Sequence, residues 1–433
     1  MSRLRLLLIL PLLASPGRIA AQVTSFERQR AHIMLDVVRD DIRKYYFDST
    51  YGGVSLSAVF DTAGARLDRA TALSQLIGAI AQATLAFNDS HTGFLPPGLV
   101  YRAEYGWRLR FIGDTCRILR VKEGSDAEAK GVHPGDAVLT IEGYQLTRDN
   151  LWQLQYLLGA IRPLATLHIT IRPPGGEPRS LEIAAKVIER RHIVDPGSSF
   201  DLGELIREED DAWTESAPRW AEFDDRVVVW WVGSFYSYSE WVDALVKSAR
   251  KHQAVVLDLR GNSGGAVRSL LRLLGGLYAD KVTVADEVER RSRKPMIAEG
   301  KGADHAQASF VVLVDAGSAS ASEIFARTMQ LTRRGTVIGD RSAGAVRESR
   351  AYVHSVGTQT AAFYGASVTV ADLVMPDGGR LEGGGVTPDE LILPSGEDLR
   401  DRRDPALARA LTLAGVATTP EQAGRLIWSV DKE

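Results

Sequence analysis

The sequence predicts an α/β protein with a helical N-terminal domain, a β-rich middle domain and a larger core. Apolar residues recur at helical spacing across residues 25–90, and short strand-like runs fill residues 100–190. Across residues 226–395, short apolar runs alternate with helical segments. Such alternation is typical of a mainly parallel sheet.

The chain divides where its composition and periodicity change. An acidic, irregular stretch precedes the core, and we interpret it as a solvated connector. A short helix is expected near residues 404–413. The predicted parts are a signal peptide (1–21), a helical domain (22–99), a β-rich domain (100–190), an acidic connector (191–225), a core (226–395) and a helical tail (396–433).

The first 21 residues have the pattern of a secretory signal peptide. Arg3 and Arg5 are basic, residues 6–13 are apolar, and small residues follow at Ala20 and Ala21. The alternative is a membrane anchor, but the apolar run is shorter than the roughly 20 residues that a spanning helix needs. We therefore expect a periplasmic or secreted protein.

The composition of the chain disfavours a nucleic-acid partner, an intrachain disulfide and a metal cofactor. The net charge of −3 gives no basic field for nucleic acid, so none is expected as a partner. The single cysteine, Cys116, excludes an intrachain disulfide and is predicted to be structural. No HExxH motif or clustered ligand set appears, so no metal or other cofactor is expected.

The middle domain resembles a PDZ domain. Residues 131–143, GVHPGDAVLTIEG, are similar to the turn and strand that follow the short helix of such domains. The resemblance implies a loop that binds the terminal carboxylate of a peptide through backbone N–H groups, beside a strand edge that pairs with the peptide. An ordinary small β-domain with a Pro-Gly turn is the alternative. The residues of the implied loop are Tyr105, Gly106, Trp107, Arg108 and Leu109.

Two loops of the core carry unusual residues where strands end, which is where sites form in open α/β sheets. Residues 258–265, DLRGNSGG, form a glycine-rich loop without the pattern of a nucleotide site. In the second loop, Ser320 precedes a predicted helix whose positive end stabilises a developing oxyanion. Ser320 and Glu323 also fit a helix capping box, and both roles are compatible.

These loops resemble the paired signature of the tail-specific, or C-terminal processing, serine peptidases. DLRGNSGG is followed by GSASASEIF at residues 317–325, and LEGGGVTPD at 381–389 is similar to a third segment of that family. The resemblance implies a crotonase-like protease core with Ser320 as nucleophile. It also implies that the backbone N–H groups of Gly265 and Ala321 bind the oxyanion.

The sequence departs from family members that use a Ser–Lys dyad. Ala345 stands where their lysine would be. The branch of the family similar to the tricorn protease core uses a histidine instead, and the chain has Ser90 and His91 in a matching segment. This resemblance implies that His91 is the general base, oriented by Ser90 and Glu382. The alternative for His91 is a surface residue at a helix end.

Three functions are compatible with these motifs. The first is a serine peptidase that acts on exported proteins or peptides, with specificity near their C-termini. The second is a catalytically inactive binding scaffold of the same fold. The third is a crotonase-like acyl-CoA enzyme, which the predicted export signal and the PDZ-like insertion disfavour.

Overall fold

The structure is a computed structural model that describes residues 23–97, 101–189, 218–223, 225–235, 239–357 and 362–430. The predicted signal peptide and most of the predicted connector lie outside these residues. No helix within the described ranges combines the length and apolar character needed to cross a membrane.

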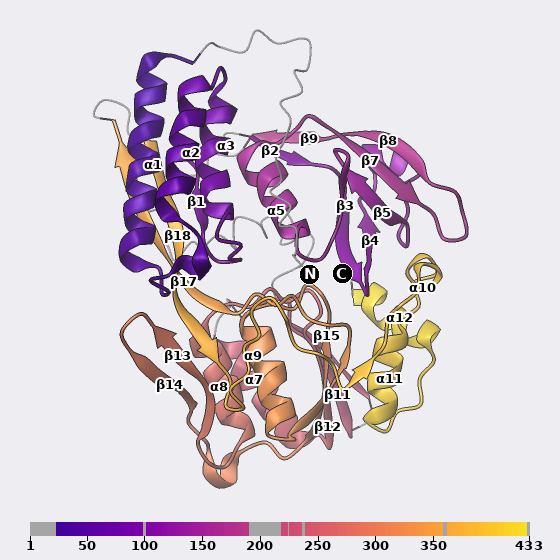
Figure 1. Ribbon diagram of the computed structural model, residues 1–433. Coiled ribbons are helices and arrows are strands. Elements are labelled where there is room, and N and C mark those ends of the chain that lie inside the picture. Colours follow the sequence, from indigo (N-terminus) through magenta and orange to yellow (C-terminus); the bar gives the residue numbers. More distant parts are fainter. Residues whose placement is uncertain are drawn as a thin grey trace, which may run out of the picture.

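The N-terminal region is a bundle of three helices, α1 (Ser25–Tyr45), α2 (Leu56–Arg69) and α3 (Leu73–Leu85), with a short turn of 3-10 helix, η1 (Tyr51–Gly53). Thr24 and Glu27 form a capping box that fixes where α1 begins. The apolar faces of the helices share a core with buried residues of one long strand, β18 (Ala362–Val374). Figure 1 shows the bundle alongside the upper part of this strand.

The β-rich domain is a six-stranded antiparallel sheet with a helix beside it. The expected strands are present as β3 (Trp107–Ile112), β4 (Thr115–Val121), β5 (Ala137–Ile141), β7 (Thr166–Arg172) and β8 (Arg179–Ala184), with a short β6 (Tyr144–Gln145). One helix, α5 (Leu151–Gln155), lies among these strands and continues as a π-helical turn, η2 (Tyr156–Ile161). The remaining elements are α4 (Asp126–Ala129) and the pair β2 (Tyr101–Glu104) and β9 (Lys186–Glu189).

The core is built on a mainly parallel sheet, as the sequence predicts. Its order is β10-β11-β12-β15-β16-β19, and all neighbours after β10 run parallel. Every residue of β12 is buried because both faces of the sheet are covered. The strands are β10 (Arg219–Phe223), β11 (Val227–Trp231), β12 (Ala254–Asp258), β15 (Ser309–Val314), β16 (Gly335–Gly339) and β19 (Glu390–Leu391).

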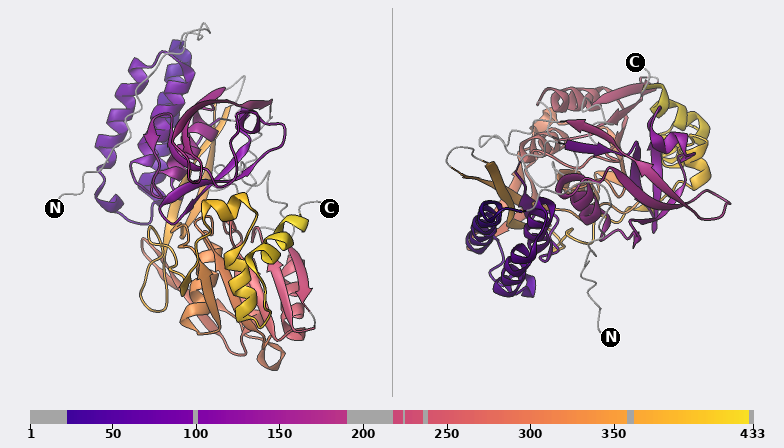
Figure 2. Two further views of the ribbon diagram at one scale, coloured as in Figure 1. Left: turned by 90° about the vertical axis from the view of Figure 1, so that its right-hand side faces the viewer. Right: turned by 90° about the horizontal axis from the view of Figure 1, so that it is seen from above.

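Different helices cover the two faces of this sheet. One face packs against α7 (Ser239–Lys251), α8 (Val267–Leu277) and α9 (Ala321–Leu331). The other face packs against α11 (Pro405–Leu413) from the C-terminal tail, which also contains α10 (Gly396–Arg400) and α12 (Pro420–Val430). Figure 2 shows the tail helices, in yellow, against the side of the core.

Two sequence predictions are wrong in part. Residues 219–223, assigned to the solvated connector, form the edge strand β10, in which Trp220 stacks on Trp230 of β11. The helical domain also ends in a strand, β1 (Gly93–Leu95), which pairs with β18.

A second, antiparallel sheet joins the helical bundle to the core. Its strands are β1, β13 (Val282–Glu289), β14 (Arg293–Ala298), β17 (Arg347–Val356) and β18. Strand β18 pairs with β1 through residues 365–367 and with β13 through residues 371–374. The last described helical turn, η3 (Gly302–Asp304), follows β14. This sheet was not predicted, and it positions the segment that carries His91.

Candidate active site

Ser320 occupies a strained turn between β15 and α9. Its φ of 54° and ψ of −117° are unusual for a residue with a side chain. Its backbone N–H donates to the Ala345 carbonyl at 2.9 Å and to the Glu323 carboxylate at 3.1 Å. These two hydrogen bonds hold the turn, so the strain is built into the position of the serine.

The glycine-rich loop lies directly against Ser320. A Cβ atom added to Gly264, whose φ is +101°, would lie 2.6 Å from the Ser320 Cβ atom, so only glycine fits. The Asn262 side chain holds the loop, because it donates to the Val232 carbonyl at 2.7 Å and accepts the Gly264 N–H at 2.9 Å. The loop therefore has a fixed contact with the serine turn.

Two backbone donors beside Ser320 are available for an oxyanion. Among the described residues, no hydrogen bond engages the N–H of Gly265 or the N–H of Ala321. Ala321 is the first residue of α9, where N–H groups have no partner within the helix. The structure thus places both predicted oxyanion donors next to the predicted nucleophile.

Ser90, His91 and Glu382 form one hydrogen-bonded chain. The Ser90 hydroxyl lies 2.8 Å from Nδ1 of His91 and 3.0 Å from Oε1 of Glu382. A hydroxyl has one proton, and an ionised carboxylate only accepts, so Ser90 donates to Glu382. Ser90 then accepts from Nδ1–H of His91, which leaves the lone pair of Nε2 available in the neutral imidazole. This is the tautomer that a general base requires.

Residues 342–346 link the hydrogen-bonded group of Ser90, His91 and Glu382 to the turn that carries Ser320. The Ala345 carbonyl accepts the Ser320 N–H, and the next N–H, from Val346, donates to Oε2 of Glu382 at 2.8 Å. No hydrogen bond between the His91 ring and the Ser320 hydroxyl is found in the described part of the chain. Ala345 and Val346 therefore link the turn that carries Ser320 to the hydrogen-bonded group of Ser90, His91 and Glu382.

The Glu323 carboxylate binds residues 342–345 through hydrogen bonds. Its carboxylate accepts from Ser342 Oγ at 2.6 Å, Gly344 N–H at 2.8 Å and Ala345 N–H at 2.9 Å, in addition to Ser320. Burial raises the pKa of the Glu323 carboxyl to about 7, and the hydrogen bonds oppose this rise. The sequence indicated only a capping role for this residue.

Asp89 and Arg347 support the His91 segment and were missed by the sequence analysis. Asp89 is fully buried and accepts from the His91 N–H at 2.9 Å, from Tyr46 at 2.9 Å, from Thr369 at 2.8 Å and from Arg347 at 2.7 Å. The only sequence signal was the position of Asp89 next to the Ser-His pair. Arg347 gave no signal, because its partners are distant in sequence.

The carboxylates of this cluster do not fit a metal ion. Ligand atoms of Asp89, His91 and Glu382 lie within 4.8 Å of one another, which is a spacing that a metal could bridge. However, both Asp89 oxygens already accept hydrogen bonds from protein donors, and Glu382 accepts from Ser90 and Val346. The arrangement instead suits proton transfer.

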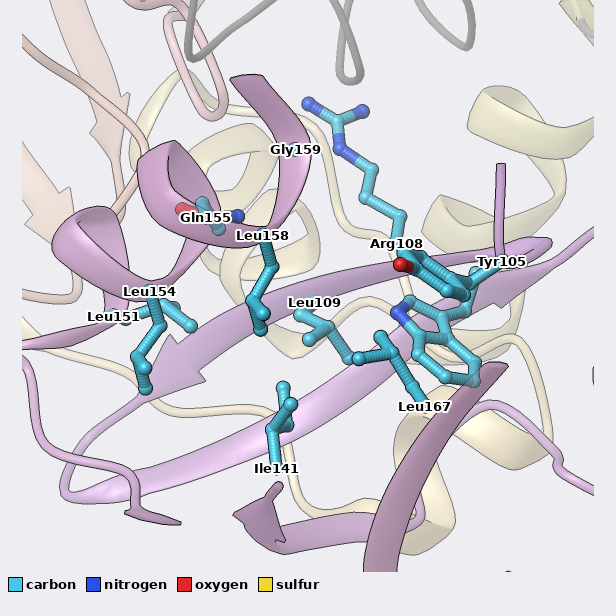
Figure 3. A pocket seen from close by; sticks show the side chains of 11 residues that line it. Tyr105, Arg108, Leu109, Ile141, Leu151, Leu154, Gln155, Leu158, Gly159 and Leu167 are labelled. Carbon is cyan, nitrogen blue, oxygen red and sulfur yellow. The ribbon is translucent and has the colours of Figure 1, made fainter. Parts of the chain in front are cut away.

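The β-rich domain has an apolar groove between β3 and α5. Figure 3 shows Leu109, Ile141, Leu158 and Leu167 converging within it. Of the five residues predicted to bind a peptide, all except Gly106 line the groove. Gly106 forms the turn before β3, with a φ of +80°.

Two buried ion pairs attach this domain to the loops that follow β15 and β16. Arg110 of β3 pairs with Asp315 at 2.6 Å, and Arg148 pairs with Asp340 at 2.5 Å. The Arg108 side chain lies beside the glycine-rich loop, because its Nη2 atom is 3.0 Å from the position of a Cβ atom built on Gly261. The strand that lines the groove therefore also contacts the glycine-rich loop.

Comparison with known proteins agrees with this geometry. Residues 230–392 match the model of Peptidase family S41. The core of the chain is similar to this family. It is 26% identical to a tail-specific protease of Haemophilus influenzae, over 74% of the chain and 46% of the relative, and 27% identical to a carboxyl-terminal-processing protease of Synechocystis, over 62% and 57%. The chain thus spans about half the length of these two relatives.

Solved structures support the expected fold over most of the chain. The photosystem II D1 C-terminal processing protease is 19% identical with a TM-score of 0.53, covering 92% of this chain and 99% of that one. Mature CPAF is 13% identical with a TM-score of 0.66, covering 87% and 95%. The predicted α/β class, with a helical N-terminal region followed by β-rich parts, is confirmed.

Proposed function

We propose that the chain is a serine-type peptidase that hydrolyses peptide bonds of exported proteins. Ser320 is the nucleophile, His91 is the general base, and Ser90 and Glu382 orient the base. The observation that carries this proposal is the hydrogen-bonded chain from Glu382 through Ser90 to His91, which sets the imidazole tautomer. The match of residues 230–392 to the model of Peptidase family S41 supports the same chemistry.

The proposed reaction follows the usual acyl-enzyme course. Nε2 of His91 takes the proton from the Ser320 hydroxyl while the oxygen attacks the scissile carbonyl carbon. The N–H groups of Gly265 and Ala321 bind the oxyanion, and Glu382 stabilises the imidazolium through Ser90. His91 then protonates the leaving amine, and water hydrolyses the ester by the same steps. Substrate binding forms the hydrogen bond between His91 and Ser320, since catalytic hydrogen bonds are often longer before substrate binds.

The groove of the β-rich domain would select substrates by their C-termini. An extended peptide would pair with the edge of β3, and its last side chain would enter the apolar groove beside Leu109 and Leu158. The names of the relatives, which include C-terminal processing enzymes, support this specificity. The signal-peptide pattern of residues 1–21 supports a periplasmic or secreted location.

A fluorophosphonate probe tests the chemistry, since it reacts with activated serines. We expect the wild-type protein to be labelled at Ser320 and both Ser320→Ala and His91→Ala to remain unlabelled. His168→Ala is the matched control, because His168 is exposed on β7 and distant in sequence from the site. An unlabelled wild-type protein that still binds peptides would support the inactive scaffold instead.

The substrate specificity has a separate test. One protein substrate is prepared with a free and with an amidated C-terminus, and cleavage of both is compared with cleavage of a short peptide. We expect amidation to raise KM for the protein substrate and to leave kcat unchanged. Equal KM values for the two forms would reject capture of the C-terminus and leave the peptidase proposal in place.

A further inference from the structure

Arg260 of the glycine-rich loop is held between two carboxylates. Its guanidinium donates to Asp258 through Nε at 3.0 Å and Nη2 at 2.6 Å. On its other side it donates to both oxygens of Asp404, through Nη1 at 3.0 Å and Nη2 at 2.7 Å. The side chains of the three residues are only 18%, 4% and 9% exposed. Two-point contacts of this kind fix the orientation of an arginine.

The two carboxylates come from different parts of the chain. Asp258 is the last residue of β12, directly before the loop that leads to Gly265. Asp404 is the N-cap of α11 in the C-terminal tail, beyond the residues that match the family model. The tail helix packs its apolar residues on the sheet face opposite α9, so Asp404 approaches the loop from the other side of the sheet.

The fixed arginine lies at the start of the loop that carries an oxyanion donor. The next residue, Gly261, has a φ of +75°, and its N–H donates to Asp315. Asn262 then holds Gly264 against Ser320. Four residues separate Arg260 from Gly265, so the contacts of Arg260 are one of the anchors that set the course of the loop.

We propose that Asp404 is a positioning residue for the oxyanion hole. Its carboxylate clamps the Arg260 guanidinium and thereby holds the loop that presents the Gly265 N–H, which makes the C-terminal tail part of the catalytic unit. This inference rests on the proposed peptidase function. It adds a residue outside the matched family region whose effect is on transition-state stabilisation and not on substrate binding.

Asp404 also caps helix α11, and the test must separate this structural role from the proposed positioning role. Its Oδ1 atom accepts the Leu407 N–H at 2.9 Å and so caps α11. Asparagine also caps helices well but cannot form the ionic clamp. An alanine at this position can neither cap the helix nor pair with Arg260, whereas a glutamate keeps the negative charge. The variants Asp404→Asn, Asp404→Ala and Asp404→Glu therefore distinguish capping from clamping.

The experiment measures kcat and KM on a peptide substrate, normalised to the fraction of protein that a fluorophosphonate labels. For Asp404→Asn we expect kcat to fall about tenfold with KM within twofold, because a displaced oxyanion donor costs less than the 100-fold or more of a deleted one. Asp404→Glu should recover part of the loss. The matched control is Asp401→Asn, since Asp401 of the same tail is 3.7 Å from Arg403 and does not contact the loop.

Amide hydrogen exchange gives a readout independent of activity. We expect faster exchange across residues 261–266 in Asp404→Asn and no change there in Asp401→Asn. If Asp404→Asn has wild-type kcat and exchange while Asp404→Ala unfolds at lower temperature, Asp404 only caps the helix and the inference is wrong. A wild-type protein that is not labelled at all would instead overturn the proposed function.

Discussion

Replacement of Arg110 by methionine tests how the β-rich domain is attached to the catalytic loops. Arg110 is buried at 8% exposure, and its guanidinium lies 2.6 Å from Oδ2 of Asp315. Oδ1 of Asp315 accepts the N–H groups of Gly261 and Gly317, each at 2.9 Å. Methionine fills similar space without charge, so the variant leaves a buried carboxylate without its counter-ion.

The expected cost follows from these contacts. Removal of one partner of a buried ion pair costs about 3–5 kcal/mol in free energy of unfolding. Two N–H donors still stabilise the carboxylate of Asp315, so we expect the lower end, about 3 kcal/mol. An exposed pair is worth about 0–1 kcal/mol. The matched control is therefore Arg293→Met, because Arg293 is 60% exposed and pairs with Asp286 at 2.6 Å.

The pH dependence gives a second signature. Burial alone would raise the pKa of Asp315, but the Arg110 charge and the two N–H groups lower it below its ordinary value. A depressed carboxyl pKa contributes stability that is present above the unfolded pKa and is lost as pH falls through the folded pKa. Without Arg110 this contribution shrinks, so the difference between wild type and variant should be largest at neutral pH and smaller in acid.

Urea unfolding followed by tryptophan fluorescence measures both effects. We expect Arg110→Met to lose about 3 kcal/mol at pH 7 and Arg293→Met less than 1 kcal/mol. The reasoning is refuted if the two variants lose equal stability, or if the loss in Arg110→Met stays constant between pH 7 and the acid range where Asp315 protonates.

Two further predictions concern catalysis. Glu382→Gln should lower kcat roughly 100-fold, which is within the range that general-base catalysis supplies. The reason is that a neutral amide stabilises the imidazolium less well through Ser90. Wild-type turnover of a peptide by this variant would contradict the role of Glu382. Gly264→Ala should abolish fluorophosphonate labelling, because its Cβ atom would lie 2.6 Å from that of Ser320, whereas Gly302→Ala, where nothing lies within 4 Å, should label normally. Normal labelling of Gly264→Ala would show that the loop relaxes freely.

The parts of the fold that the sequence predicts well are those with clear periodicity. The strands of the parallel sheet are continuous apolar runs because both faces are buried, and the helices that follow them have apolar stripes. Strand β18 lacks either pattern. Eleven consecutive residues from Tyr364 to Val374 are buried, and they include Ser367, Thr369 and Asp372, which bond to other parts of the chain. These buried polar residues interrupt the apolar run, so β18 does not have the continuous apolar pattern that identifies the strands of the parallel sheet.

The sequence predicts residues of the site but not how they are connected. Motif order selected Ser320, His91 and Glu382, and their catalytic roles stay predictions. The structure links Glu382 to Ser90 and to Val346 by hydrogen bonds. The sequence contained no information that Ala345 and its neighbour would bridge them, because those contacts are made by backbone atoms. For the same reason Glu323 was predicted to cap a helix, although three of its four donors come from residues 342–345.

The long sheet that carries β1 and β18 has a consequence for how the protein is made. Ser90 and Glu382 are hydrogen-bonded across 292 positions of the chain. A chain synthesised from its N-terminus contains His91 early, Ser320 much later and Glu382 only near the end. On the proposed function, a chain that ends before Glu382 lacks the carboxylate that orients the base, so the site is complete only when most of the chain has been made.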